Sequence, residues 1–285
     1  MSAAIERSSP LAGGTRTRLI QAGPHDATEA VVFVHGNPGS ADDWERLIGA
    51  VAAGTGKRAV AFDLPDFGET VAPLDFEHTV FGYAGFLGEA LSELGIERAH
   101  LVVHDFGGPI GLVWAMAHPD ALASVTLINT GLLPGYRWHY LARIWRRPVL
   151  GELFQAITTR RGYRFALSRN EPRGLPREFV ETMYNHYDRR TRQAVLKLYR
   201  ATPDPGGMSE NLIELLRPRD IPALVIWGEH DVYLPSSYAH RQQEAFPSAD
   251  VHVLPASGHW PHADAPETVE RLLVEFLARV GASAP

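Results

Sequence analysis

Short apolar runs rich in β-branched residues alternate along the chain with segments long enough to form helices. Six such runs stand out: Ala30–Val34, Arg58–Phe62, His100–Val103, Ser124–Ile128, Ala223–Trp227 and Val251–Leu254. Continuous apolar runs of this length are typical of parallel strands that are buried on both faces and connected by crossover helices. The pattern therefore predicts the α/β class, with a mostly parallel, doubly wound sheet.

The strand pattern stops between Asn129 and Pro222. This stretch is rich in Arg, Tyr, Trp and Pro, and it favours short helices separated by turns, for example at Pro176–Tyr187 and Arg189–Ala201. We interpret residues 131–217 as a helical cap inserted into a core that comprises residues 15–130 and 218–282. The two ends of the chain, Met1–Gly14 and Gly281–Pro285, are expected to be frayed.

Composition narrows the class of protein. The formal charge of −6 makes nucleic acid an improbable partner, and the absence of cysteine excludes a thiol nucleophile or a disulfide framework. No apolar run approaches the ~20 residues that span a bilayer, and Met1–Gly14 lacks the apolar core of a secretion signal. No two histidines lie four residues apart in a predicted helix, so no metal is expected. We expect a cytoplasmic enzyme, either a monomer or a homodimer.

The segment Leu101–Gly108 carries an aspartate between an apolar strand and a helix predicted at Phe106–His118. The glycines that follow the aspartate allow a tight, strained turn in which the central side chain stands exposed above the sheet. Asp105 is therefore a candidate nucleophile. Its alternative role is that of N-cap for the following helix, which Asp fills readily. Val103 occupies the position, two residues before the nucleophile, that usually holds a small residue.

Two later strand ends supply partners for this aspartate. A carboxylate pair, Glu229 and Asp231, follows the fifth predicted strand, and a Gly-His pair follows the sixth. The carboxyl ends of parallel strands face a common crevice, so these side chains are expected to converge there. Asp231 is the preferred acid, with Glu229 as its competitor. His259 is the preferred base because small residues precede it in a flexible turn, and His230 and His262 are its rivals.

A glycine-containing loop, His35-Gly36-Asn37-Pro38-Gly39, directly follows the first predicted strand. Such a loop allows a backbone N–H group to point into the crevice at the strand end. The N–H groups of Asn37 and Phe106 are the candidate donors of an oxyanion hole, and His35 is assigned to the same site. The alternative is a plain tight turn with His35 packed beneath it.

Together with Asp63–Gly68, these motifs make the chain resemble the α/β-hydrolase superfamily over essentially its whole length. The order nucleophile, acid, histidine is the order of that family. The aspartate at the elbow is similar to that of the branch containing epoxide hydrolases and haloalkane dehalogenases. The resemblance implies a triad of Asp105, His259 and Asp231 that needs no cofactor and that forms a covalent ester with a saturated carbon of the substrate.

The leaving group distinguishes the two activities of this branch. Dehalogenases usually carry Trp after the nucleophile, where the indole N–H holds the halide, but Phe106 has no such donor. Asn37 matches a halide-binding Asn of some dehalogenases. Asn129 stands where some of them carry their acid, which leaves the acid role to Asp231.

Epoxide hydrolases resemble this chain in a Tyr-Arg pair of the cap, matched here by Leu198-Tyr199-Arg200. A protonated Tyr199 would donate to the opening ring, although a helical packing stripe also explains a tyrosine there. The candidates for a second donor are Tyr140, Tyr163, Trp138 and His139.

We therefore predict an epoxide hydrolase that gives vicinal diols. The alternative is a haloalkane dehalogenase or a related hydrolase, and a less favoured one is a non-catalytic binding protein of the same fold. We expect a small organic molecule as the substrate, and the aromatic content of the predicted cap indicates an apolar one that can be bulky.

Overall fold

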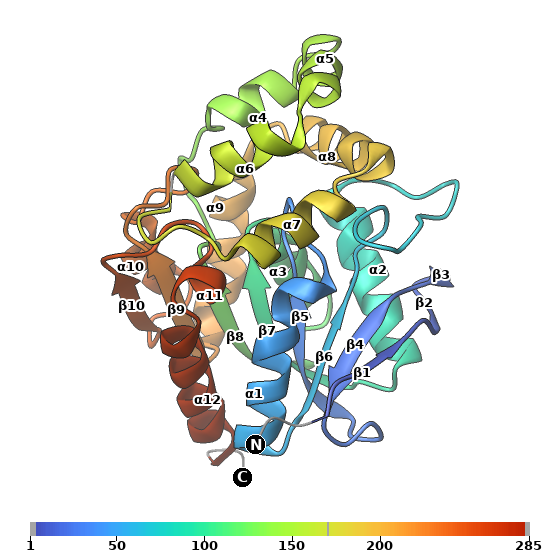
Figure 1. Cartoon of the computed structure of the whole chain (residues 1–285). Coiled ribbons are helices and arrows are strands. Elements are labelled where there is room, and N and C mark those ends of the chain that lie inside the picture. Colours follow the sequence, from blue (N-terminus) through green and yellow to red (C-terminus); the bar gives the residue numbers. More distant parts are fainter. Residues whose placement is uncertain (1–3, 170, 283–285) are drawn as a thin grey trace.

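A single sheet forms the centre of the molecule. The computed structural model describes residues 4–169 and 171–282 of the chain. An eight-stranded sheet has the order β1-β4-β6-β5-β7-β8-β9-β10, and β2 and β3 form a separate pair (Figure 1). The strands are β1 Glu6–Ser8, β2 Leu11–Ala12, β3 Thr15–Arg16, β4 Leu19–Ala22, β5 Glu29–Val34, β6 Arg58–Phe62, β7 Arg98–His104, β8 Leu122–Ile128, β9 Ala223–Gly228 and β10 Asp250–Leu254.

The strands from β5 to β10 pair in parallel, whereas β1 pairs with β4 and β4 pairs with β6 in the antiparallel sense. All six predicted strands are present, and their observed bounds extend the predicted ones by at most two residues at either end. The prediction of a mostly parallel, doubly wound α/β sheet is therefore confirmed. Because the parallel strands run the same way, their carboxyl ends share one edge, where the candidate site residues lie.

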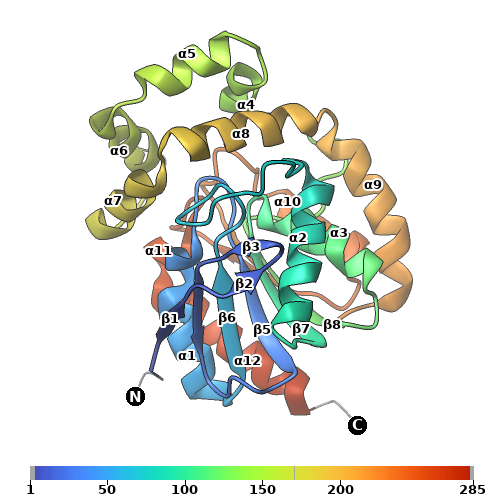
Figure 2. The same cartoon turned by 90° about the vertical axis from the view of Figure 1, so that its right-hand side faces the viewer.

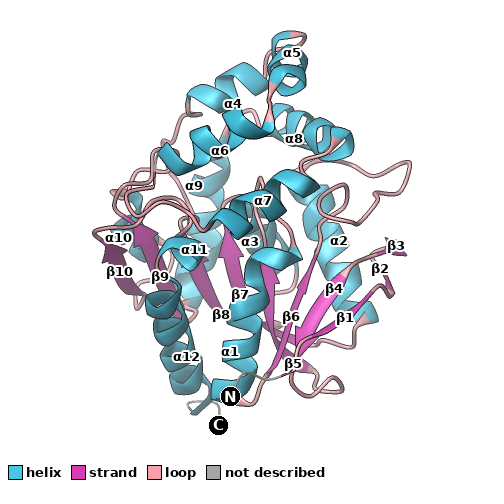
Figure 3. Ribbon diagram, viewed as in Figure 1, coloured by secondary structure: helices cyan, strands magenta, loops and turns pink. Residues whose placement is uncertain are grey.

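Helices cover both faces of the sheet (Figure 3). Alternate residues of β5 point to opposite faces: Val31 and Phe33 pack with α1 and α12, while Val32 and Val34 pack with α2 and α3. This alternation explains why the strand is apolar at every position. The helices of the core are α1 Glu45–Thr55, α2 Val80–Glu93, α3 Gly107–Ala117, α10 Tyr238–Arg241, α11 Pro261–Asp264 and α12 Pro266–Ala282, with 3₁₀ turns η1 Ala41–Trp44, η2 Arg217–Arg219 and η3 Gln242–Glu244.

Six helices lie between β8 and β9 in the sequence. They are α4 Tyr140–Trp145, α5 Leu150–Ile157, α6 Arg160–Arg169, α7 Arg177–His186, α8 Arg189–Ala201 and α9 Pro205–Leu216. Helices α4 to α8, which we call the helical layer, arch over the carboxyl edge of the sheet, and α9 descends beside α3 (Figure 2). We propose that residues 131–217 are one insertion, in which the helical layer covers the sheet and α9 returns the chain to the core.

The prediction of frayed ends is wrong for much of both segments. Glu6–Ser8 pairs with β4, and Leu11–Ala12 pairs with β3. The side chains of β1 are exposed, so the sequence pattern carries no apolar signal there, although its backbone pairs with β4 at the edge of the sheet. At the other end Gly281 belongs to α12. Residues 1–3 and 283–285 lie outside the described part of the chain.

Within the described residues, no helix combines the length and the apolar character that crossing a membrane requires.

Candidate active site

Asp105 stands at the sharp turn between β7 and α3. Its φ of 48° lies in the left-handed region, which a residue with a Cβ rarely adopts. The turn also requires close backbone approach: a Cβ at Gly107 would lie 2.2 Å from the carbonyl oxygen of Val34, and one at Gly108 would lie 2.1 Å from Oγ1 of Thr130. The two glycines therefore allow α3 to begin directly against its neighbours, with Asp105 above the sheet.

The three triad candidates come together at the carboxyl edge of the sheet. Nδ1 of His259 lies 2.7 Å from Oδ2 of Asp231, and Nε2 lies 3.7 Å from Oδ2 of Asp105. The rivals lie elsewhere: Glu229 and His230 are exposed. His262 is buried and its ring stacks on Trp44, with centroids 4.8 Å apart. The geometric expectation that Asp231, not Glu229, holds the imidazole agrees with the structure.

Both oxygens of Asp231 are held by fixed groups. Its Oδ1 accepts hydrogen bonds from the backbone N–H groups of Tyr233, at 2.8 Å, and Leu234, at 2.9 Å. Its Oδ2 accepts from Nδ2 of Asn129 at 2.6 Å as well as from His259. Asn129 thus holds the candidate acid Asp231 through its side-chain amide, a contact that its place in the sequence did not reveal.

The carboxylate of Asp105 lies where the oxyanion donors were predicted. The backbone N–H of Asn37 donates to Oδ1 of Asp105 at 2.7 Å, and the N–H of Phe106 also contacts this carboxylate. His35 does not belong to this group. Its Nε2 accepts from the N–H of Leu64 at 3.0 Å, and it is fully buried beneath the loop. The assignment of His35 to the substrate site is wrong, because its ring fixes the loop from below.

Electrostatics couple His259 to the carboxylates around it. Burial disfavours the protonated imidazole, but the charge and hydrogen bond of Asp231, together with the charges of Asp105 and Glu171, outweigh it and raise the pKa of His259 to about 9. Burial raises the pKa of Asp105 above its usual range, against the opposing effects of His259 and of two backbone N–H groups. An imidazolium therefore faces Asp105 at neutral pH and favours its ionised form.

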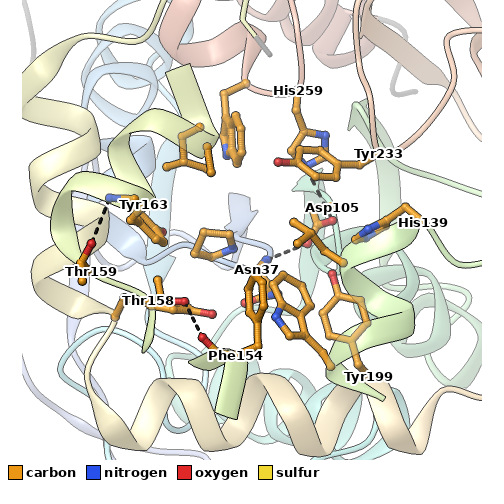
Figure 4. A pocket seen from close by; sticks show the side chains of 18 of the residues that line it. Asn37, Asp105, His139, Phe154, Thr158, Thr159, Tyr163, Tyr199, Tyr233 and His259 are labelled. Atoms are coloured by element: carbon orange, nitrogen blue, oxygen red, sulfur yellow. Dashed lines mark hydrogen bonds and ion pairs between the residues drawn. The ribbon is translucent and has the colours of Figure 1, made fainter. Parts of the chain in front are cut away.

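An apolar cavity of about 270 Å³ opens beside Asp105 under the helical layer (Figure 4). Asp105, His139, Tyr199 and His259 lie on one side of the cavity, and Thr158, Thr159 and Tyr163 lie across from them, while most of the remaining wall is aromatic and aliphatic. The lining residues of the wall include Leu141, Trp145, Phe154, Ile157, Tyr163, Ala166, Leu167, Tyr187, Tyr233 and Trp260. Such a cavity fits a small apolar molecule that carries its reactive group at one end.

Tyr199 of α8 points toward Asp105 (Figure 4). Its ring meets Phe106 edge-on, with centroids 4.9 Å apart. Burial and the negative charge of Asp105 raise its pKa well above 10.0, so the hydroxyl keeps its proton. A hydrogen-bond interaction with the buried side-chain amide of Asn37 opposes this effect.

His139 is the second polar group that the helical layer brings to the cavity. Its Nδ1 accepts from the N–H of Ala142 at 3.3 Å, as N-cap of α4. Burial and the positive charge of His259 lower the pKa of His139 to about 4. The ring is therefore neutral, and because Nδ1 accepts, its hydrogen is on Nε2.

Two other predicted contacts are not at this cavity. Tyr140 is 58% exposed and points away from the lining, so its assignment to the substrate site is wrong. Trp138 packs behind Phe106, with ring centroids 5.8 Å apart, and its Nε1 donates to the carbonyl oxygen of Thr202. The N–H of Trp138 is therefore not a donor to this cavity, and the ring instead lines a smaller pocket together with Asp105 and Phe106.

Glu171, which lies between α6 and α7, was not identified from the sequence. Its Oε1 accepts from the backbone N–H of His259 at 2.8 Å, and Oδ2 of Asp264 accepts from the N–H of Gly258 at 2.9 Å. Burial raises the pKa of Glu171 to about 8, opposed by the His259 N–H and assisted by the nearby Asp264. A single carboxylate in a loop carries no sequence signal. Tyr233, two residues after the acid, was also missed.

Comparison with known proteins relates the whole chain to one family. Residues 29–266 match the α/β hydrolase fold. A 2-hydroxy-6-oxononadienedioate/2-hydroxy-6-oxononatrienedioate hydrolase from Burkholderia vietnamiensis is 27% identical over 280 residues, which cover 93% of both chains.

Two solved structures are similar in fold. A Vigna radiata epoxide hydrolase mutant has a TM-score of 0.79 at 23% identity, covering 96% of this chain and 99% of that one. A haloalkane dehalogenase loop variant from Bradyrhizobium elkanii has a TM-score of 0.81 at 23% identity, covering 99% of each. The match of sequence, sheet order and strand-end site leads to one conclusion: the chain belongs to the α/β hydrolase fold family.

Proposed function

We propose that this hydrolase uses Asp105 as a nucleophile toward a saturated carbon and that its substrates are epoxides, which it converts to vicinal diols. The observation that carries the proposal is the carboxylate at the elbow, with Oδ1 on the Asn37 N–H and Oδ2 facing His259 and the apolar cavity. A carboxylate attacking an acyl carbon gives a labile anhydride, whereas attack on a saturated carbon gives an ordinary ester. This chemistry favours an sp³ carbon as the target.

In the first step, Oδ2 of Asp105 attacks an epoxide carbon while Oδ1 stays on its backbone donors. The carbon–oxygen bond of the ring breaks, and the released oxygen receives a proton or a strong hydrogen bond from Tyr199, with His139 as the second donor. The protonated state of Tyr199 and the Nε2–H tautomer of His139 support these roles. The product of this step is a hydroxyalkyl ester of Asp105.

In the second step, His259 takes a proton from a water that attacks the carboxyl carbon of the ester. The negative charge then develops on Oδ1, where the N–H groups of Asn37 and Phe106 stabilise it; losing one such donor typically costs ~10²–10³ in rate. The intermediate collapses, and His259 returns the proton to the departing diol oxygen. The proton left on the new Asp105 carboxyl group then restores the Tyr199 hydroxyl, so that both groups are ready for the next turnover. Esterification removes the charge of Asp105, so the pKa of His259 falls from about 9 and the ring becomes able to act as a base.

A haloalkane dehalogenase is the second candidate. The observation in its favour is the side-chain amide of Asn37, which is buried at the cavity beside Asp105. Phe106 offers a departing halide no donor, and the indole of Trp138 donates to Thr202. One amide makes a weaker halide site than two donors, so we rank this activity second.

A trapping experiment tests the covalent mechanism. His259→Gln keeps the nucleophile and removes the base, so incubation with an accepted substrate should raise the protein mass by one substrate equivalent, located on the peptide that contains Asp105. His230→Gln, on an exposed neighbouring loop, is the matched control and should turn over normally. Asp105→Asn should form no adduct.

Two further measurements separate the candidate functions. A panel of epoxides, haloalkanes and esters, scored for diol, halide and acid, identifies the substrate class. One turnover of the native protein in ¹⁸O-water should leave label in the Asp105 carboxylate. Label found only in the product, with no adduct in the histidine variant, contradicts the nucleophile assignment, and the absence of any reaction would favour a non-catalytic binding protein.

A further inference from the structure

The outer surface of the helical layer exposes a row of large apolar side chains. Leu150, Leu153 and Ile157 are spaced three and four residues apart, which places them on one side of α5, and each is at least 40% exposed. Val149, just before this helix, is exposed as well. We call these four residues the apolar stripe. Monomeric soluble proteins rarely gather so many large apolar side chains in one exposed area, and such patches mark interaction sites.

The stripe begins in a strained turn. Val149 has φ 68° and ψ −50°, and the N–H of Leu150 donates to the carbonyl oxygen of Pro148 at 2.8 Å, which closes a γ-turn of the rare positive-φ form. A β-branched residue in this region is an outlier. The Val149 side chain is 78% exposed, so burial does not offset the strain. Strain of this kind is retained where the position serves a function.

The segments before and after the stripe are rich in arginine. Residues 131–169 contain eight arginines and one acidic residue, Glu152, whereas the whole chain has a formal charge of −6. Arg143 of α4, Arg147 of the connection to α5 and Arg161 of α6 are exposed. The molecule is therefore polarised, with its basic end at the helical layer and its excess of acidic residues elsewhere.

The stripe also reaches the cavity. Ile157 is both exposed and part of the cavity lining, and so is Ala166 of α6. Phe154, also a residue of α5, lines the cavity. Helix α5 is the outermost element at the top of the molecule in both views (Figures 1 and 2). An apolar surface therefore continues from the exterior to the space beside Asp105.

We propose that this face docks on a lipid surface that carries anionic headgroups, with the apolar stripe inserted at the boundary of the acyl chains. An exposed apolar helix face bordered by arginines is the combination that binds such surfaces, through buried apolar area and attraction to anionic lipid. A second copy of the chain fits less well. In a two-fold dimer the same patch meets itself, so the arginines of one copy would face those of the other. The docking does not depend on which reaction the cavity performs.

Co-sedimentation of the full-length protein with vesicles tests the proposal. The protein should pellet with vesicles that contain phosphatidylglycerol and stay in solution with vesicles of phosphatidylcholine alone. Added salt should release it, because exposed charges are screened. Equal binding to both kinds of vesicle, or binding to neither, would overturn the proposal.

Two double variants test separately how the apolar side chains and the arginines contribute to vesicle binding, and each has a matched control. Leu150→Ser with Leu153→Ser removes apolar area outside the cavity lining and should abolish sedimentation. Leu215→Ser changes an equally exposed leucine on α9 and should not. Arg147→Gln with Arg161→Gln should weaken binding about fivefold for each arginine removed, whereas Arg219→Gln should have no effect.

Folding and oligomeric state are measured in the same samples. Circular dichroism should be unchanged in every variant, and light scattering should give a monomer mass for the native protein without vesicles. A dimer mass that reverts to a monomer in the Leu150→Ser, Leu153→Ser variant would mean that the stripe joins two copies, which overturns the lipid proposal. Sedimentation that survives this double substitution would also overturn it, since the stripe would then not be inserted.

Discussion

Asn129 connects three segments that form the site. Its removal should therefore lower the stability of the protein strongly while lowering the activity of the folded protein only slightly. Its Nδ2 donates to Oδ2 of Asp231 at 2.6 Å and to the carbonyl oxygen of Gly258 at 3.1 Å, and its Oδ1 accepts from the N–H of Gly228 at 2.9 Å. The side chain is fully buried. In the Asn129→Ala variant these three partners lose their hydrogen bonds to the amide, and because the site is buried no water replaces it. Buried groups that lose their partner cost about 1–3 kcal/mol each, so the loss of these three hydrogen bonds should lower the free energy of unfolding by about 3–9 kcal/mol.

Backbone conformation adds a smaller effect, which a second variant measures. Asn129 has φ 44°, in the left-handed region that Asn tolerates and Ala does not. Asn129→Gly loses the same three hydrogen bonds but relieves this strain, so it should be more stable than the alanine variant by about 1 kcal/mol. Urea unfolding followed by tryptophan fluorescence measures both differences.

The Asn129→Ala substitution should raise the activation free energy of the reaction far less than it lowers the free energy of unfolding. The N–H groups of Tyr233 and Leu234 still hold Oδ1 of Asp231, so the acid keeps its orientation toward His259. We expect kcat of the folded Asn129→Ala variant to fall by no more than about tenfold, or ~1.4 kcal/mol. Asp231→Asn, the comparison, should lose about 10³–10⁴. An alanine variant within about 0.5 kcal/mol of the native stability, or one as inactive as Asp231→Asn, would refute this reasoning.

Three further outcomes follow from the site. Tyr199→Phe should slow ester formation from epoxides by about 10²–10⁴, less if His139 compensates, and stopped-flow fluorescence measures it; an unchanged rate would exclude the phenol as the donor. In pH-dependent single turnovers, ester formation should decline as the pH falls through the raised pKa of Asp105, while ester hydrolysis should decline through a pKa of His259 below about 9; a shared midpoint would contradict two separate groups. Gly258→Ala places a Cβ 2.2 Å from Oε2 of Glu171, so it should cost about 1–3 kcal/mol in thermal unfolding, and the cost should shrink when Glu171 is also replaced by Ala.

The parallel strands could be predicted because burial on both faces makes each of them apolar at every position. The strand ends then located Asp105, Asp231 and His259, since parallel strands bring their carboxyl ends to one edge. Strand β1 was missed for the opposite reason: its pairing with β4 uses only the backbone, and its exposed side chains leave no apolar pattern.

Residues of the helical layer were harder to assign, because helical periodicity does not say which face covers the cavity. Tyr140 and Tyr199 are both tyrosines of this layer, yet one faces solvent and the other points toward Asp105. Trp138 and His139 are adjacent, but only His139 lines the cavity. These differences arise from how α4 and α8 pack on the core, which one sequence does not determine.

The hydrogen bond from the His259 N–H to Glu171 spans 88 residues of sequence. His259 lies in the loop that follows the last strand. Glu171, which accepts the hydrogen bond, lies between α6 and α7 and is therefore synthesised much earlier. During synthesis, Glu171 therefore has no partner for this hydrogen bond until nearly the whole chain has been made. A contact of such high sequence separation forms late because closing the intervening loop costs entropy. Competence for the reaction should thus appear as one of the last events of folding, after the sheet has formed, and a chain cut between these two segments should regain activity only when both fragments are present together.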